Sequence, residues 1–336
     1  MSFACQSDLD AALGALPAPD ASAAAKARAR QGQLTKPPGS LARLEDIAIF
    51  FAGWQGVEKP VLEAGRALIF AGNHGVTVHG VSAFPLEVTA QMVANFANGG
   101  AAINALAAAS GLDLRVVPLD LDRPTADFTR HAAMSEAECL AALCAGADAV
   151  DPGEHLIVVG EMGIGNSTAA AALAARSFGG SATQWVGPGT GLDKEGVERK
   201  AKVVADALAF HDAAPRTAFE TLRRVGGREI AAIAGAVLRA RHLRIPVILD
   251  GFISCAAIAP LAAAAPDIVH HCIAGHCSAE PGHGLLLERL GLEPLLRLGM
   301  RLGEGSGAAV AANIVRSALA AHAGMATFAE AGVSAG

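Results

Sequence analysis

Five short apolar segments most restrict the fold of this chain. They are rich in leucine and β-branched residues, and alanine-rich stretches of helical character separate them. This alternation is typical of a parallel sheet that crossover helices bury on both faces. The sequence therefore predicts an α/β fold with a mostly parallel sheet and flanking helices. The predicted strands are residues 66–71, 114–119, 155–160, 246–250 and 268–273.

Both ends of the chain have a different, helical pattern. Residues 8–35 and 40–56 are predicted helices, separated by the breaker KPPG at residues 36–39, and the chain after about Glu280 is again predicted to be helical. We expect these ends to meet as a small helical unit beside the sheet. The expected division is a large α/β domain over residues 60–280 and a small helical domain from residues 1–59 and 281–336.

The charge balance argues against two classes of function. The 336 residues include 26 basic and 32 acidic ones, for a net charge of −6, and no basic stripe is visible. The sequence therefore lacks the clustered positive charge that is typical of nucleic-acid-binding proteins. The charge-free stretches are short or broken by polar residues, whereas a membrane span needs about 20 strongly apolar residues. Because the N-terminus also lacks a signal-peptide pattern, we expect a cytoplasmic protein.

One cluster of histidines and cysteines contains the residue types that bind zinc. It consists of His270, His271, Cys272, His276 and Cys277. Its spacing matches no familiar zinc motif, and alternate residues of a strand would face opposite ways. We therefore expect buried or idle side chains rather than a metal site.

Two glycine-rich loops are candidates for binding an anion. Residues 160–168, GEMGIGNST, follow a predicted strand and begin a helix, so backbone N–H groups and the helix dipole would favour phosphate. The alternative is that Ser167 or Thr168 only caps the helix. The second loop, GPGTG at residues 187–191, precedes a helix with several lysines, including Lys200. One of these could reach a phosphate, or all could lie on a solvated helix face.

A third glycine-rich segment, RLGEGSG at residues 301–307, places one carboxylate between glycines before an alanine-rich helix. The helix dipole would lower the pKa of Glu304, whereas burial against an apolar ligand would raise it. Alternatively, Glu304 only favours the helix N-terminus. His74, Ser278 and Glu280 also follow predicted strands, where they could act on a ligand or only hydrogen-bond their loops.

Taken together, these segments resemble the nicotinate-nucleotide:5,6-dimethylbenzimidazole phosphoribosyltransferase family of cobalamin nucleotide-loop assembly. The resemblance extends from about residue 30 to about residue 320. The combination of GEMGIGN and RLGEGSG is its most specific part. The segments occur in the family's order: TKPPGSL at 35–41, NHGV at 73–76, GEMGIGNST at 160–168, GPGTG at 187–191 and RLGEG at 301–305.

The resemblance implies a reaction and a fold. The family transfers 5-phosphoribose from nicotinate mononucleotide to 5,6-dimethylbenzimidazole, giving α-ribazole 5′-phosphate and nicotinate with inversion at C1′. It implies a Rossmann-like parallel sheet with a small helical domain, a homodimer, and no metal or organic cofactor. The attacking base must lose its N–H proton, which calls for a general base. By resemblance that base is Glu304.

The resemblance also implies which residues bind the two substrates. Phe84 is apolar where some members of the family have a hydroxyl. The residues expected around the phosphate and ribose are Glu161, Gly163, Gly165, Asn166, Ser167, Gly189, Lys200, Asp250 and Ser278, and those expected around the aromatic base are Ser82, Phe84, Met92, Leu302 and Gly303.

Two other functions remain open from the sequence. The first is an NAD(P)-dependent oxidoreductase built on the glycines of the 160–168 loop. A dinucleotide site would need an acidic residue about 20 positions further on, and the segment around Trp185 has none. The second is a non-catalytic ligand-binding paralogue. The presence of Glu304 and both glycine loops argues against it.

Overall fold

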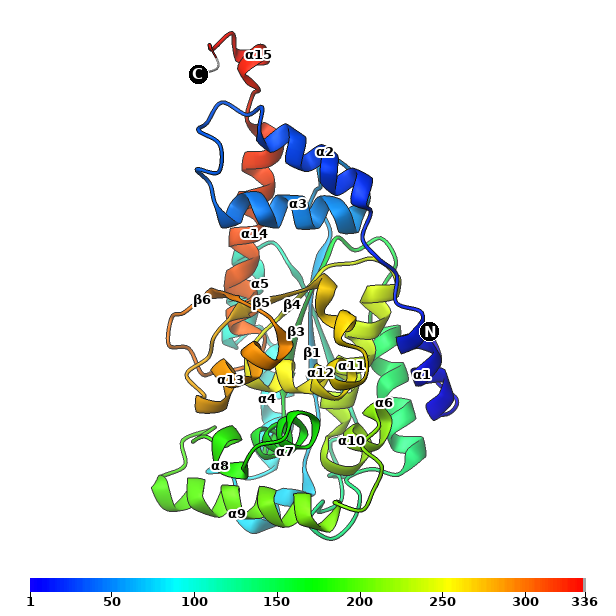
Figure 1. The fold of residues 1–336 in the computed structure, drawn as a ribbon. Coiled ribbons are helices and arrows are strands. Elements are labelled where there is room, and N and C mark those ends of the chain that lie inside the picture. The colour runs from blue at the N-terminus through cyan, green and yellow to red at the C-terminus, as the bar shows by residue number, and fades with distance from the viewer. Residues whose placement is uncertain (335–336) are drawn as a thin grey trace.

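A six-stranded sheet forms the centre of the molecule in the computed structural model, which describes residues 1–334 (Figure 1). The strand order is β2-β1-β3-β4-β5-β6, and all neighbouring strands are parallel. The predicted α/β fold with a mostly parallel sheet is therefore confirmed. The strands are β1 (Gly65–Ala71), β2 (Asp113–Pro118), β3 (Leu156–Met162), β4 (Val247–Leu249), β5 (Cys272–His276) and β6 (Pro294–Leu296).

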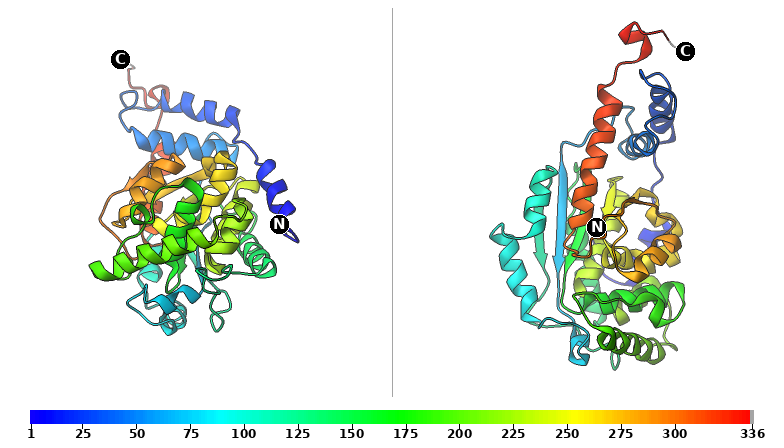
Figure 2. Two further views of the ribbon diagram at one scale, coloured as in Figure 1. Left: turned by 60° about the horizontal axis from the view of Figure 1, so that its bottom comes forward. Right: turned by 90° about the vertical axis from the view of Figure 1, so that its left-hand side faces the viewer.

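Helices cover both faces of this sheet. Figure 2 shows the cyan α4 and α5 and the green α7 to α9 on opposite sides. The helices are α1 (Gln6–Gly14), α2 (Ala21–Gln31), α3 (Arg43–Gln55), α4 (Glu87–Ala97), α5 (Ala102–Ala109), α6 (Glu136–Asp148), α7 (Asn166–Phe178), α8 (Ala182–Trp185), α9 (Lys194–Phe210), α10 (Ala218–Val225), α11 (Arg228–His242), α12 (Phe252–Ala264), α13 (Pro281–Leu290), α14 (Ser306–Gly324) and α15 (Phe328–Ala331), with 3₁₀ turns η1 (Gly75–His79) and η2 (Pro266–His271).

The central strands β1, β3, β4 and β5 are apolar on both faces because each face lies against a separate core. Successive side chains of a strand point to opposite sides. In β1, Ala67 and Ile69 therefore pack with α3, α5 and α14, whereas Leu68 and Phe70 pack with the helices of the other face. All four side chains are fully buried. This two-sided burial explains the continuous apolar strand segments.

The predicted strand at residues 268–273 is wrong in its position. Residues Pro266–His271 form η2, and the strand begins only at Cys272. Pro266 favours the start of a helical turn, and the ring of His271 bonds locally to the carbonyl of Ile268, with Nδ1 at 2.9 Å. Apolar composition alone does not distinguish such a buried turn from a strand.

Two further expectations about the ends of the chain need correction. The segment after Glu280 is not all helical, because the short edge strand β6 pairs with β5. β6 has three residues and begins with a proline, which an edge strand tolerates but which hides it from periodicity analysis. The predicted helix at residues 8–35 is in fact α1 and α2, and the Asp20 side chain caps α2 by accepting from the Ala23 N–H at 2.9 Å.

The two ends of the chain meet through α14. This helix packs on β3, β4 and β5 and continues beyond the sheet to pack on α3, while α2 packs on α3 (Figure 1). The side chain of Arg30 donates to the carbonyl of His322 at 3.0 Å, which joins α2 to the end of α14. The division into domains stays a prediction, because α14 contacts both groups of elements. None of the helices described is both long and apolar enough to cross a membrane.

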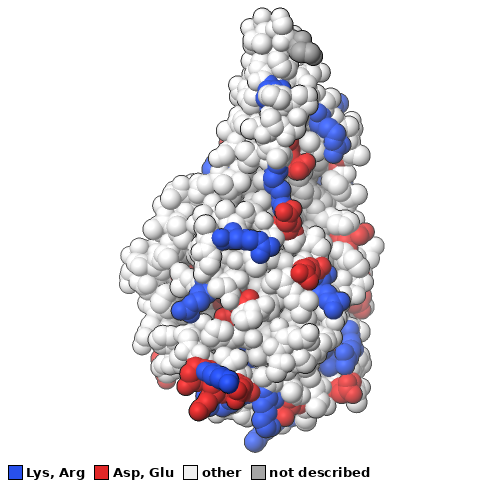
Figure 3. Space-filling model, turned by 60° about the vertical axis from the view of Figure 1, so that its left-hand side comes forward, with Lys and Arg blue, Asp and Glu red and all other residues white. Residues whose placement is uncertain are grey.

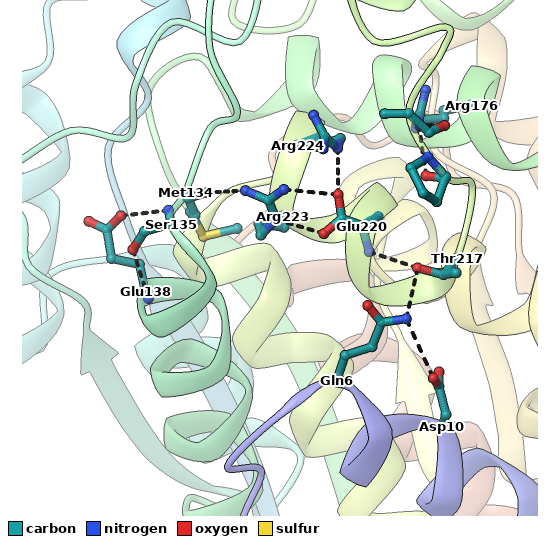
Figure 4. Close-up of polar contacts among 12 residues, drawn as sticks. Gln6, Asp10, Met134, Ser135, Glu138, Arg176, Thr217, Glu220, Arg223 and Arg224 are labelled. Atoms are coloured by element: carbon teal, nitrogen blue, oxygen red, sulfur yellow. Dashed lines mark hydrogen bonds and ion pairs between the residues drawn. The ribbon is translucent and has the colours of Figure 1, made fainter.

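Helix α1 packs in a different place from α2 and α3, on the side of the sheet that carries α10 (Figure 4). Gln6 Nε2 in α1 donates to Thr217 Oγ1 at 3.4 Å. Within α10, Glu220 receives hydrogen bonds from Arg223 and Arg224, and Arg223 Nη1 also donates to the carbonyl of Met134 at 3.4 Å. These contacts hold α10 against the segment before α6.

Candidate active site

The loops at the carboxyl ends of β3, β4, β5 and β6 enclose a pocket of about 260 Å³. In parallel α/β sheets this edge is where ligands bind. On the face shown in Figure 3, side chains of Lys and Arg as well as of Asp and Glu are scattered over a mainly uncharged surface. The lining residues are Phe84, Glu161, Met162, Gly163, Ile164, Asn166, Ser167, Gly189, Thr190, Gly251, Phe252, Ile253, His276, Ser278, Glu280, Arg301, Leu302, Gly303 and Glu304.

Glu304 is held in this pocket by an unusual backbone conformation. Its φ angle is 61°, and the flanking Gly303 and Gly305 have φ angles of 84° and 76°. A non-glycine residue in this region costs on the order of 1–3 kcal/mol and persists only where its surroundings enforce it. The two glycines let the chain turn into α14 while Glu304, which is 6% exposed, lines the pocket.

One oxygen of the Glu304 carboxylate is left without a hydrogen-bond partner by the described chain. Oε2 is buried and has no hydrogen-bond partner among residues 1–334. Burial raises the pKa of Glu304 above its ordinary value, and the nearby negative charge of Asp250 raises it further. The raised pKa makes the Glu304 carboxylate a stronger base than an exposed one.

Asp250 stabilises the loop around Glu304 through hydrogen bonds to the backbone. Its Oδ2 accepts from the Gly305 N–H at 3.1 Å, and its Oδ1 accepts from the Ala308 N–H at 2.9 Å. Both donors belong to the first turn of α14, whose N–H groups otherwise lack partners. The structure therefore places Asp250 as a cap of α14, outside the residues that line the pocket, and its contact with the ribose stays a prediction.

A second carboxyl group, Glu161, lies beside the same loop. It accepts a hydrogen bond from the Asn166 side chain. A Cβ atom at Gly303 would come within 2.6 Å of its Oε1, so only glycine fits there. Burial raises the pKa of Glu161 to about 8, against the lowering effect of Asn166 and with help from the charges of Asp250, Glu229 and Glu304. At neutral pH it is protonated and can donate a hydrogen bond.

The predicted anion loops form the other end of the pocket. α7 begins at Asn166, and Gly165 at its N-cap has a φ angle of 97°. The Nζ of Lys200 lies 3.1 Å from Ser167 Oγ and donates to the Gly187 carbonyl at 2.9 Å. Lys200 is 1% exposed, and burial lowers its pKa to about 8. A helix N-terminus and a buried cation together favour an anion here.

The pocket brings together most of the predicted residues. Of those expected from the sequence, Glu161, Gly163, Asn166, Ser167, Gly189, Ser278, Phe84, Leu302, Gly303 and Glu304 line it.

The other predicted residues are not among those that line the pocket. Gly165 packs against Thr77 and His74, and Lys200 stands behind Ser167 and Gly189. Ser82 Oγ is 3.4 Å from the Oγ1 of Thr190, which is itself a lining residue. Met92 packs against the core on the α4 side of the sheet.

Sequence reasoning missed His276 as a residue of the pocket. It is 1% exposed, neither ring nitrogen has a hydrogen-bond partner in the described chain, and Nε2 lies 3.5 Å from Asp250 Oδ1. Its position at the carboxyl end of β5 is the signal that could have found it. The predicted strand ended three residues too early, which hid that signal.

The structure separates the histidines and cysteines that were considered as zinc ligands. His271 is buried and bonds to the carbonyls of Ile268 and Val237, whereas His270 is exposed near Asp267. Residues 1–334 contain no group of three His, Cys, Asp or Glu side chains that could hold a metal ion.

The fold and the pocket define a class of protein. A parallel α/β sheet carries a buried, unpaired carboxylate beside apolar side chains, next to a helix N-terminus with a buried lysine. This arrangement suits an enzyme that holds an anionic group beside a carboxylate able to accept a proton.

Comparison with known proteins identifies the family. A family model described as phosphoribosyltransferase matches residues 16–333. A nicotinate-nucleotide--dimethylbenzimidazole phosphoribosyltransferase from Novosphingobium aromaticivorans is 72% identical over 99% of both chains, and one from Ruegeria pomeroyi is 61% identical over 96% of both. A crystal structure of CobT from Thermus thermophilus matches with a TM-score of 0.87 and 42% identity, over 94% of this chain and 100% of that one. The chain belongs to the nicotinate-nucleotide--dimethylbenzimidazole phosphoribosyltransferase family.

This membership confirms the predicted family and enzyme class, a phosphoribosyltransferase. It also argues against the oxidoreductase alternative.

Proposed function

We propose that this chain transfers 5-phosphoribose from nicotinate mononucleotide to 5,6-dimethylbenzimidazole. The products are α-ribazole 5′-phosphate and nicotinate, the reaction inverts C1′, and Glu304 acts as the general base. The observation that carries this proposal is the buried, unpaired Oε2 of Glu304 in the pocket. The names of the close relatives support the two substrates.

The chemistry needs only one proton acceptor from the protein. One ring nitrogen of the benzimidazole forms a bond to C1′ as the bond from C1′ to the pyridinium nitrogen breaks. The electron pair of the broken bond stays on nicotinate, which neutralises its ring charge, so no acid is needed there. The other benzimidazole nitrogen gives its proton to Glu304. A general base of this kind contributes about 10²–10⁴-fold to the rate.

The phosphate end of the donor fits the first turn of α7. Asn166 and Ser167 begin this helix and line the pocket, and Lys200 supports Ser167 from behind. Gly189 lies opposite, where a Cβ atom would come within 2.9 Å of Ser167 Oγ and 3.0 Å of Lys200 Nζ. Holding the phosphate here would fix the ribose between the anion site and Glu304, which supplies the alignment that displacement requires.

The aromatic base fits the apolar wall beside Glu304. Phe84 and Leu302 line this part of the pocket, and both are about half exposed. A flat ring between them would bury these exposed apolar surfaces and exclude water from C1′. Contact of the substrate with Ser82 or Met92 stays a prediction.

Product analysis tests the proposal directly. The protein is incubated with nicotinate mononucleotide and 5,6-dimethylbenzimidazole, and the products are separated by chromatography. Formation of α-ribazole 5′-phosphate and nicotinate in equal amounts is the expected result. Binding of both ligands without turnover would indicate the non-catalytic paralogue instead.

Two statements about assembly and location belong to the same proposal. We infer a homodimer from the family resemblance, and a cytoplasmic location remains an expectation from the sequence. Light scattering of the purified protein tests the first, and cell fractionation tests the second.

A further inference from the structure

The contact between Ser278 and His283 is not used by the reaction described above. Ser278 follows β5 and lines the pocket, whereas His283 lies in the first turn of α13 and is fully buried. His283 Nδ1 is 2.8 Å from the backbone N of Ser278 and 2.9 Å from its Oγ. Two polar groups of one residue therefore approach a single ring nitrogen.

These contacts fix the tautomer of His283. The backbone N–H of Ser278 can only donate, so Nδ1 must be the acceptor and carries no hydrogen. The hydrogen of the ring is then on Nε2, which lies 3.4 Å from the sulfur of Cys255. Burial, with a smaller contribution from His276, lowers the pKa of His283 to about 3, so the ring is neutral throughout the working pH range.

The tautomer in turn fixes the Ser278 hydroxyl. His283 Nδ1 has a single lone pair, which the backbone N–H and the hydroxyl of Ser278 share as donors. At 2.9 Å the Oγ···Nδ1 contact is attractive when the hydroxyl hydrogen lies between the two atoms. The Oγ–H of Ser278 is therefore directed at His283. The lone pairs of Oγ remain for the pocket, where Ser278 can accept a hydrogen bond but has no hydrogen left to donate.

We propose that His283 is a positioning residue that makes Ser278 the acceptor for a ribose hydroxyl of the phosphoribosyl donor. This inference rests on the proposed function, which supplies the substrate. The phosphate and the nicotinate carboxylate of that donor only accept hydrogen bonds at neutral pH, and its pyridinium nitrogen has no hydrogen. The ribose hydroxyls are its hydrogen-bond donors, so an acceptor-only serine selects them.

Two analogues of the phosphoribosyl donor, each lacking one ribose hydroxyl, test the inference. We compare kcat/KM for nicotinate mononucleotide with its 2′-deoxy and 3′-deoxy analogues. A site built to pair a hydroxyl rejects the analogue that lacks it. The wild type should therefore prefer the full ribose over one of these analogues by about tenfold or more. Ser278→Ala should reduce this preference to near unity, because both donors then meet no acceptor.

Two substitutions at His283 distinguish an effect on the Ser278 hydroxyl from an effect on the overall stability of the protein. His283→Leu removes the acceptor and frees the hydroxyl to turn, so the preference should fall severalfold. In His283→Asn the side-chain oxygen takes the place of Nδ1, so most of the preference should return. His271→Leu is the matched control, since His271 is equally buried but bonds to backbone carbonyls away from the pocket. It should lower the melting temperature and leave the preference unchanged.

Nitrogen NMR of the wild type tests the tautomer without any substitution. His283 Nδ1 should have the chemical shift of an unprotonated acceptor from pH 5 to pH 9, and a protonated Nδ1 would overturn the inference. An unchanged ribose preference in Ser278→Ala would also overturn it. The inference would be overturned too if Ser278→Ala lost only its selectivity for a donor with a 5′-phosphate, because Ser278 would then donate a hydrogen bond to the phosphate. Absence of all turnover in the wild type contradicts the proposed function instead, and titration calorimetry with the same donors then decides the role of Ser278.

Discussion

The carboxylate of Asp250 holds the backbone N–H of Gly305 at 3.1 Å, directly beyond Glu304. Its second oxygen binds the N–H of Ala308 one turn further on, at 2.9 Å. One side chain thus caps α14 and fixes the left-handed turn that presents the candidate base. The same negative charge also raises the pKa of Glu304. Asp250 therefore contributes to both the structure and the acidity of this site, although burial is the larger cause of the raised pKa.

Asp250→Asn should separate these two effects. The amide retains one acceptor oxygen, so α14 loses about one capping bond, which costs on the order of 1 kcal/mol of folding stability. Loss of the negative charge should lower the pKa of Glu304, so the acid limb of the kcat/KM profile should move to lower pH. Denaturant unfolding and a pH profile measure the two effects. A limb that does not move would show that Asp250 has no electrostatic influence on the base.

Glu304→Gln should remove the base and leave the pocket intact. The amide has nearly the same shape but cannot accept the benzimidazole proton at neutral pH, so kcat should fall by at least about 100-fold. Donor affinity, measured by calorimetry, should stay near the wild-type value. Glu293→Gln, which changes an exposed carboxylate paired with Arg43, is the control. A loss of less than about tenfold, or 1.4 kcal/mol, would assign the base to another group.

The pH dependence of the wild type should report the raised pKa of Glu304. A general base works in its ionised form, so kcat/KM should rise with pH through this pKa and level off until Lys200 begins to lose its charge near pH 8. Because burial and Asp250 raise the pKa, the midpoint should lie above 4.5, the ordinary value for a glutamate. Steady-state rates from pH 4 to pH 9 measure it. A midpoint at or below the ordinary value would contradict the environment described for Glu304.

The sequence was sufficient to find the sheet edge and the residues that form its loops. Four of the five predicted strands lie close to their observed places because two-sided burial leaves a continuous apolar segment. Glu304 and Ser167 were found because glycines surround them where a strand or loop leads into a helix. Such glycines mark backbone conformations that other residues resist, and the pocket uses them for that reason.

The sequence could not show which polar residues support the site from behind. Asp250 follows β4 and His276 ends β5, but whether such a side chain faces a ligand or a helix N-terminus depends on contacts across the sheet. The raised pKa values of Glu161 and Glu304 likewise depend on burial by distant segments. Strand β6 was missed because three residues give no measurable periodicity.

Lys200→Met should weaken donor binding more than binding of the free aromatic base. The substitution keeps much of the side-chain volume and removes the buried charge 3.1 Å from Ser167 Oγ. We expect at least a tenfold loss of affinity for nicotinate mononucleotide, about 1.4 kcal/mol. Lys202→Met on the same helix changes an exposed lysine paired with Asp206 and serves as the control.

The pH dependence of donor binding gives a second test of whether the charge of Lys200 contributes to the phosphate site. Burial lowers its pKa in the free protein to about 8, so the cation is lost as the pH rises above this value. Wild-type affinity for the nucleotide should therefore decline above pH 8, and the decline should be absent in Lys200→Met. An equal decline in both proteins would remove Lys200 from the phosphate site.

Glu161 should make the free protein less stable as the pH rises. In the unfolded chain its carboxyl loses a proton near pH 4.5, whereas burial raises the pKa in the folded protein to about 8. Between these values the folded state binds more protons than the unfolded state, so the free energy of unfolding falls with increasing pH. The contribution of Glu161 is thus fully present below about pH 4.5 and is lost by about pH 8.

Glu161→Gln should remove this dependence, because the amide does not ionise and can still accept from Asn166. The variant and the wild type should have similar stability at pH 5, and the variant should be the more stable of the two at pH 8. Urea unfolding at a series of pH values measures the difference. Glu154, whose pKa burial raises to about 7, remains in both proteins and contributes the same background slope. A difference between the two proteins that stays constant with pH would mean that Glu161 is ionised in the folded state, so that it could not donate a hydrogen bond to a ligand.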